Sequence, residues 1–192
     1  MFAVQARYRG RERRRAELVA NSAQALATLE GVNPFRIIGV EDIVGCIDTA
    51  QATVDVVMAL LAYGDWAIAI GVSNDDEAGI MSLLKTVMGK HTRAGVVKVG
   101  VKRGKRKDKA WAEDIQASFI LLGHVLMKRT AEGKEATSLV RSGLNQNEAA
   151  EELGISKQAM SQRLQAAGWQ AEVAGYKQAV SLLNRAETEM TC

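Results

Sequence analysis

The chain has 192 residues, of which 47% are hydrophobic and 24% are charged, and it carries a net charge of +3. This apolar fraction excludes a wholly disordered chain, and no apolar run approaches the roughly 20 residues that a membrane span needs. The first residues lack the apolar stretch of a signal peptide. Cys46 and Cys192 are too few for a disulfide framework or a metal cage. We therefore expect a cytoplasmic protein without a membrane contact, a cofactor or a metal, in which Cys46 is a core residue and Cys192 a free thiol.

The first two thirds of the chain alternate strand and helix patterns. Alternation and short apolar runs predict strands, and apolar residues at helical spacing predict helices. The expected strands are Phe2–Tyr8, Phe35–Val40 with Ile43–Ile47 as its hairpin partner, Trp66–Val72 and Val96–Lys102. The expected helices are Glu17–Leu29, Ala50–Ala62 with Thr49 as its cap, Glu77–Met88 and Ala110–Met127, and everything after Thr130 reads as helix.

The charges are distributed unevenly along these elements. Residues 7–15 hold six arginines and residues 85–109 hold ten basic residues, whereas residues 37–84 hold eight acids and no lysine or arginine. Such an asymmetry indicates a polyanionic partner. The alternative is that each basic run is a solvated loop. Residues 103–109 are expected to be a basic turn or loop, and the glycine-containing segment 95–104 a loop or a β-hairpin. A basic hairpin there could touch a DNA backbone.

Residues 146–164 have the layout of a helix-turn-helix. Ala149, Ala150 and Leu153 supply the small and apolar face of a first helix. Gly154 suits the positive φ of a tight turn, and Ser156 can cap the second helix. Met160 and Leu164 are spaced i and i+4 and are expected to pack inward. The alternatives are a helical hairpin that only builds a core and a helix-turn-helix that binds protein.

The helical spacing decides which residues of the second helix face outward. In this motif the second helix enters the major groove, glutamine can pair with adenine, and serine can pair with several bases. The residues expected to contact bases are Lys157, Gln158, Ser161, Gln162 and Gln165.

Phosphate contacts are expected from the ends of the motif and from the two basic runs. Residues 142–192 contain four basic residues and six acids, so the missing positive charge must come from those runs or from a dimer. The residues expected to contact phosphates are Gln146, Ser156, Arg163, Arg11, Arg13, Arg14, Arg15, Lys102, Arg103, Lys105, Arg106 and Lys107. The tail from Glu172 to Glu187 either packs on its own domain or forms the interface of a homodimer.

The order of these pieces resembles the SatD family, which joins a cyclase-like, ferredoxin-type N-terminal domain to a C-terminal helix-turn-helix. The similarity is best from Gly143 through Leu164 and at Ala167-Gly168-Trp169, and it is looser in the N-terminal part. The resemblance implies an α+β fold: a small ferredoxin-like or cyclase-like α/β domain followed by an all-helical helix-turn-helix domain. We place the α/β domain at 1–109, a connecting helix at 110–129 and the helix-turn-helix domain at 130–192.

The resemblance does not extend to a catalytic metal site. Cyclase-like domains hold metal through an aspartate on the first strand and a carboxylate in the hairpin, but here Arg7 and Arg9 stand near the end of the first strand. Glu41 and Asp42 are adjacent, so on a strand they point to opposite faces. We expect them to pair with nearby arginines or to remain solvated, and we expect no enzyme.

The sequence therefore predicts a transcriptional regulator that binds specific double-stranded DNA sequences as a homodimer through its C-terminal helix-turn-helix. We expect it in the cytoplasm, associated with the nucleoid. One alternative is an architectural DNA-binding protein of the nucleoid-associated or phage type. Another is a ligand-sensing domain derived from a cyclase-like fold, so a small-molecule effector stays open as a partner.

Overall fold

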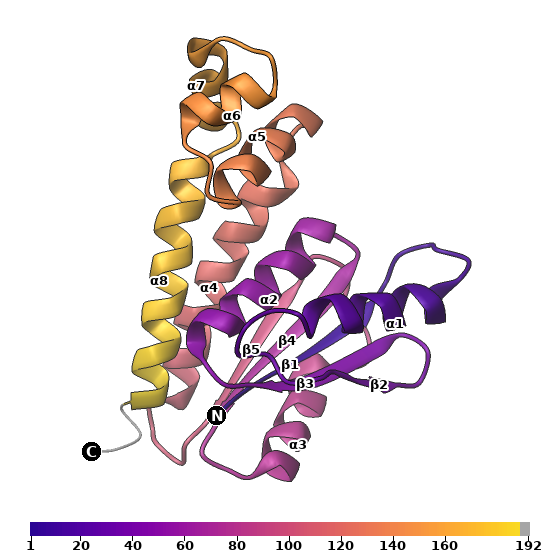
Figure 1. The fold of residues 1–192 in the computed structure, drawn as a ribbon. Helices are drawn as coiled ribbons and strands as arrows, with labels where there is room; N and C mark the ends of the chain where they lie inside the picture. Colours follow the sequence, from indigo (N-terminus) through magenta and orange to yellow (C-terminus); the bar gives the residue numbers. More distant parts are fainter. Residues whose placement is uncertain (189–192) are drawn as a thin grey trace.

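The computed structural model describes residues 1–188, and the chain forms a mixed five-stranded sheet with helices followed by an all-helical region (Figure 1). The strands are β1 (Phe2–Tyr8), β2 (Arg36–Ile38), β3 (Asp42–Ile47), β4 (Trp66–Ser73) and β5 (Val97–Lys102). The helices are α1 (Arg15–Leu26), α2 (Ala50–Tyr63), α3 (Glu77–Met88), α4 (Asp108–Met127), α5 (Ala131–Arg141), α6 (Gln146–Glu152), α7 (Lys157–Ala166) and α8 (Trp169–Thr188). The expected α+β class is confirmed.

The sheet has the order β2-β3-β1-β4-β5. β1 is antiparallel to both β3 and β4, so the elements β1-α1-β2-β3-α2-β4 form the ferredoxin-like βαββαβ arrangement. Every residue of β4 is buried, as its continuous apolar run predicts for a central strand. Thr49 caps α2 as expected, because its side chain accepts from the N–H of Ala52.

The direction of the last strand decides between the two alternatives for the basic residues that follow it. β5 pairs in parallel with β4, from Ile68 opposite Val97 to Ser73 opposite Lys102. A parallel pair needs a crossover, which α3 supplies here. The basic run that follows is therefore no hairpin but the loop that leads from β5 into α4.

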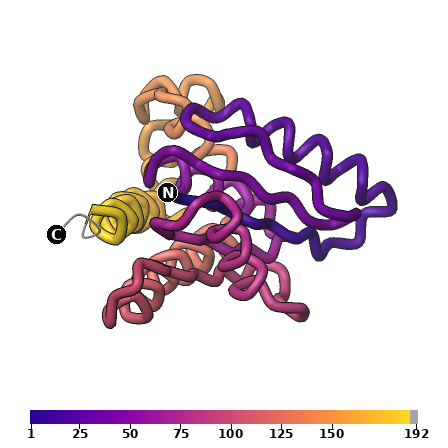
Figure 2. Tube along the Cα trace, turned by 90° about the horizontal axis from the view of Figure 1, so that it is seen from below, coloured from indigo at the N-terminus to yellow at the C-terminus, as the bar shows by residue number. Residues whose placement is uncertain are grey.

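The two faces of the sheet are covered differently. Alternate residues of β1 and β4 point to opposite faces. One set, which includes Val4 and Ile70, packs with α1, α2, α4 and α8 in the larger core. The other set, which includes Ala3 and Ala69, packs with α3. Figure 2 shows α8 and α1 at opposite sides of the molecule when it is seen from below.

α4 and α8 form a two-helix stalk that carries the remaining helices (Figure 1). Each has 20 residues, so at about 1.5 Å per residue each is about 30 Å long. α5, α6 and α7 are inserted between them in the chain and lie at the end of the stalk farthest from the sheet. We call these three helices the tip.

The expected tail helix exists, and it packs within its own chain, on the sheet and α4 as well as on the helix-turn-helix region. Ala179, Leu183 and Ala186 of α8 are fully buried in the core that also contains the sheet. The inner face of α8 therefore fastens the helical region to the α/β region and is not available to a second copy.

Cys46 is half-buried, at the edge of the core around α3, and Cys192 lies outside the described residues. Within residues 1–188, no helix combines the length and the apolar character that a membrane crossing requires.

Replacing Leu183 with alanine tests the packing of α8. Leu183 is fully buried between the stalk and the sheet, so its truncation should lower the free energy of unfolding by about 2–5 kcal/mol. Asn184→Ala is the matched control on the exposed face, with an expected effect within about 0.5 kcal/mol. Urea unfolding followed by circular dichroism measures both. Equal stability of the two variants would contradict this packing.

Candidate nucleic-acid interface

The tip is built around a small apolar core of its own. Ala136, Ala149, Ala150, Met160 and Leu164 are buried against one another. Alanines on α5 and α6 allow the three helices to approach closely, and the two larger side chains of α7 fill the space between them. The inward positions predicted for the helix-turn-helix are confirmed.

The turn between α6 and α7 has the predicted geometry. Gly154 adopts φ +62°, a conformation that costs glycine little. The Ser156 hydroxyl accepts a hydrogen bond of 3.1 Å from the N–H of Ala159 and so caps α7. Because the Ser156 hydroxyl already accepts this hydrogen bond, the expected phosphate contact would involve the exposed backbone of Ser156 more than its side chain.

Sequence reasoning missed the cap of α6. Asn145 accepts from the N–H groups of Asn147 and Glu148, at 2.9 and 3.1 Å, and Glu148 accepts from the N–H of Asn145 at 2.8 Å. This reciprocal capping box has the signature Asn-x-x-Glu, which the sequence contains. Gln146 is exposed at the start of α6, and its side chain remains free to meet a phosphate.

The outward face of α7 brings the five expected base-contacting residues together. Lys157, Gln158, Ser161, Gln162 and Gln165 are all exposed and cover an arc of about 140° at 100° per residue. A shallow hollow lined by Gln146, Ser161 and Gln165 lies beside this face, between α6, α7 and the start of α8. The tip therefore presents a strip of hydrogen-bonding side chains in which Lys157 is the only cation among the five.

Little positive charge supports this strip. Residues 131–167 hold four basic residues and five acids. Arg163 is about one-third exposed and lies 3.8 Å from Glu135 of α5, so part of its charge is already balanced. The surface of the tip is thus nearly neutral.

The first basic run lies away from the tip. Arg11, Arg13 and Arg14 are exposed at the loop that precedes α1, which lies on the side opposite α8 in both views (Figures 1 and 2). Arg15 is also expected to meet phosphate, but its guanidinium lies 2.8 Å from Glu41 and is only half exposed.

The expected pairing of Glu41 and Asp42 with arginines is confirmed. Arg7 makes a two-pronged ion pair with Asp42, at 2.7 and 2.8 Å, and this contact raises the pKa of Arg7 above its ordinary value. Arg9 lies 3.2 Å from Glu41 and also donates to the carbonyl oxygens of Lys90 and Thr92. Among the described residues, no group of histidine, cysteine or acidic side chains is arranged to hold a metal ion.

The part of the second basic run that was expected to contact phosphates, residues 102–107, leads from β5 into α4 at the end of the stalk opposite the tip (Figure 1). An earlier part of the run, around Gly95, lies beside Met127 at the other end of α4. Lys102 is paired with Asp75 at 2.7 Å, and Lys105, Arg106 and Lys107 are exposed. Because α4 separates this loop from α5, about 30 Å of helix lies between the loop and the tip. The polar strip on α7 and residues 102–107 do not adjoin.

Arg103 is a correction to the expected phosphate contacts, because its side chain is fully buried. It donates to Asp108 at 3.1 Å and to the carbonyl oxygen of Ala186 at 2.8 Å, and it lies over the ring of Trp111. Arg103 therefore joins the β5–α4 loop to the end of α8. The sequence could not show that Arg103 is buried, because Arg103 stands among other basic residues and only the fold brings Ala186 and Trp111 next to it.

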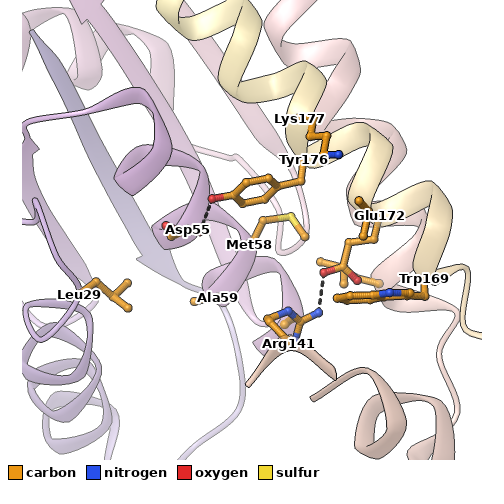
Figure 3. Close-up of a pocket in the computed structure, with 12 residues that line it drawn as sticks. Leu29, Asp55, Met58, Ala59, Arg141, Trp169, Glu172, Tyr176 and Lys177 are labelled. Carbon is orange, nitrogen blue, oxygen red and sulfur yellow. Dashed lines mark hydrogen bonds and ion pairs between the residues drawn. The ribbon is translucent and has the colours of Figure 1, made fainter. Parts of the chain in front are cut away.

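A buried ionic cluster connects the stalk to the tip, and sequence reasoning did not find it. Arg129, just beyond α4, donates to Glu172 of α8, to the carbonyl oxygen of Ala167 at 2.8 Å and to Thr137 of α5 at 3.3 Å. Arg141, at the end of α5, pairs with the same Glu172 carboxylate (Figure 3). Glu172 is nine-tenths or more buried. We call Arg129, Glu172 and Arg141 the joint.

Comparison with known proteins identified no relative of the chain. No protein-family model, no curated protein and no solved structure matches the chain.

Asp108 supplies a pH-dependent test of the buried Arg103. Partial burial raises the pKa of Asp108, but hydrogen bonds from the N–H groups of Arg103 and Lys105 and from the Arg103 guanidinium outweigh this and lower it below its ordinary value. A lowered pKa contributes stability above the unfolded value of about 3.9, and the contribution is lost as the pH falls through the folded value. Asp108→Asn should therefore cost about 1–3 kcal/mol near neutral pH and progressively less below about pH 4.

Urea unfolding of the parent and the variant at matched pH values measures this difference. Asp114→Asn, on an exposed part of α4, is the control and should change stability by no more than about 0.5 kcal/mol. A cost for Asp108→Asn that stays the same from neutral to acid pH would contradict the assignment.

Proposed function

We propose that the chain binds double-stranded DNA and that α7 reads base edges in the major groove, as a transcriptional regulator does. The observation that carries this proposal is the exposed strip on α7. Five side chains that can donate or accept hydrogen bonds face outward from a capped helix at the end of a stalk, while the apolar side chains of the same helix hold the tip together. Glutamine and serine are suited to base edges.

The near-neutral tip favours a protein that selects its sequence over one that coats DNA. Non-specific affinity comes mainly from phosphate neutralisation by basic residues. Residues 131–167 hold four basic residues and five acids, so phosphate neutralisation by the tip contributes little affinity. The architectural alternative needs a continuous basic surface, and residues 11–15 and 102–107 lie apart from the tip.

A homodimer remains part of the proposal, because a second tip doubles the base contacts. α4 offers a surface for it: Ile120, Leu121 and Met127 are 56%, 67% and 63% exposed. Exposed apolar side chains grouped in this way mark protein contacts. A two-fold dimer would bind two half-sites about 34 Å apart or a multiple of that spacing.

No catalytic role is proposed. In the SatD resemblance, Glu41 and Asp42 stand where a cyclase-like domain would hold a metal. Here both carboxylates form ion pairs with arginines, namely Arg7, Arg9 and Arg15. The resemblance itself stays a prediction.

Selection from a pool of random duplexes, followed by fluorescence anisotropy with the selected site and a scrambled one, tests the proposal. The parent chain should enrich a defined sequence. The double variant Gln158→Ala/Gln162→Ala should lose about 1–3 kcal/mol of preference for each base contact removed, because each side chain pairs with one base. Its affinity for scrambled DNA should change little.

Gln178→Ala is the matched control, since Gln178 is an exposed glutamine on α8 outside the tip. Footprinting of the selected duplex shows whether one or two half-sites are covered. A pool without any enriched sequence, or a double variant that keeps the parent preference, would overturn base reading by α7. Long, poorly bounded protection would support the architectural alternative instead.

A further inference from the structure

A cavity of about 540 Å³ lies where the α/β region, the stalk and the tip meet (Figure 3). α2 forms one wall through Met58 and Ala59, and α8 forms the other through Val173 and Tyr176. Arg141 closes the end nearest the tip. Small-molecule sites are commonly clefts of about 300–1,000 Å³ and often occur between domains.

The walls are mostly apolar, and their polar groups are gathered at two places. At one, the Tyr176 hydroxyl donates to Asp55 at 2.7 Å. Burial first, and then the neighbouring Asp55 carboxylate, raises the pKa of Tyr176, so the phenol keeps its proton and the Asp55 carboxylate keeps a donor. At the other, Arg141 lies over the ring of Trp169, 5.7 Å from its centre, and pairs with Glu172.

The charges around Glu172 do not balance. Glu172 carries one negative charge but is shared by two guanidinium groups, Arg129 and Arg141. The side chain of Arg129 is 3% exposed and that of Arg141 is 49% exposed, so the unmatched positive charge faces the cavity. Lys177 adds a second cation to the lining.

We propose that this cavity binds a small amphipathic molecule with a flat or branched apolar body and a single anionic group. The apolar body packs between α2 and α8, and a carboxylate or similar anion meets the exposed edge of Arg141. A guanidinium donates two parallel hydrogen bonds to such a group. A cationic ligand is disfavoured, because the acids that line the cavity are already paired with Tyr176 and with the arginines.

The site requires the whole chain. Met58 belongs to α2, Arg141 to the tip and Tyr176 to the stalk, so residues 1–125 alone lack two of the walls. Because Arg141 also belongs to the joint, an anion bound to its exposed edge contacts the same guanidinium that pairs with Glu172. Occupancy of the cavity thereby acts on the contact that positions the tip.

Titration of the full chain with the fluorescent probe 8-anilinonaphthalene-1-sulfonate, an aromatic molecule with one sulfonate, tests the site without DNA. Ala59→Phe fills the cavity from α2, and Arg141→Gln removes the exposed charge. Ala78→Phe on the exposed face of α3 and Arg185→Gln on α8 are the matched controls. Thermal unfolding checks that each variant retains a cooperative fold, since this probe also binds partly unfolded chains.

Saturable binding by the parent is expected, with a Kd that rises about tenfold or more in Ala59→Phe and in Arg141→Gln and stays within about twofold in both controls. 2-Naphthoate should displace the probe at a concentration about tenfold lower than its neutral amide does. Ala59→Phe does not touch the joint, so it decides the outcome if Arg141→Gln fails to fold.

Three results would overturn the proposal: no saturable binding up to about 1 mM probe, equal binding by Ala59→Phe and Ala78→Phe, or equal displacement by the acid and the amide. Failure here leaves DNA binding by α7 untouched, because no step of this experiment involves DNA.

Discussion

The Glu172 carboxylate is the contact on which the placement of the helix-turn-helix depends. It is buried and shared by Arg129, from the end of α4, and by Arg141, from the end of α5. Arg129 also holds the carbonyl oxygen of Ala167, where α7 ends. Breaking such a buried pair by removing one partner typically costs about 3–5 kcal/mol, because a charge is left without compensation. The joint therefore connects α5 and the end of α7 in the tip to both helices of the stalk through one acid and two arginines.

This placement determines which surfaces can act together. The tip stands at the end of an about 30 Å stalk, so α7 faces outward with its polar strip uncovered. The two basic runs are fixed elsewhere: Arg15 pairs with Glu41, and Arg103 is buried beneath α8. In the proposed function, the nearly neutral surface of the tip gains little from phosphate attraction, so the affinity for DNA would depend on base contacts and on a second copy. The cavity beside Arg141 is lined by residues of the α/β region, the stalk and the tip together.

Features set by neighbouring residues could be predicted from the sequence, and features set by distant ones could not. The inward positions of Met160 and Leu164, the cap at Ser156 and the turn at Gly154 follow from helical spacing and from the preferences of single residues. The roles of Arg103 and Glu172 depend on contacts across 83 and 43 residues of chain, which only the fold brings together. The parallel pairing of β5 could not be predicted for the same reason, since an apolar run does not indicate the direction of the neighbouring strand.

The central claim is that the tip, and not the basic runs, meets DNA. Amide chemical-shift mapping of the full chain during titration with a selected duplex tests it most directly. The account predicts that the largest shifts fall within residues 156–165 and at Gln146, whereas residues 103–107 at the far end of the stalk stay unchanged. Shifts centred on residues 103–107 or 11–15, with α7 unaffected, would contradict it.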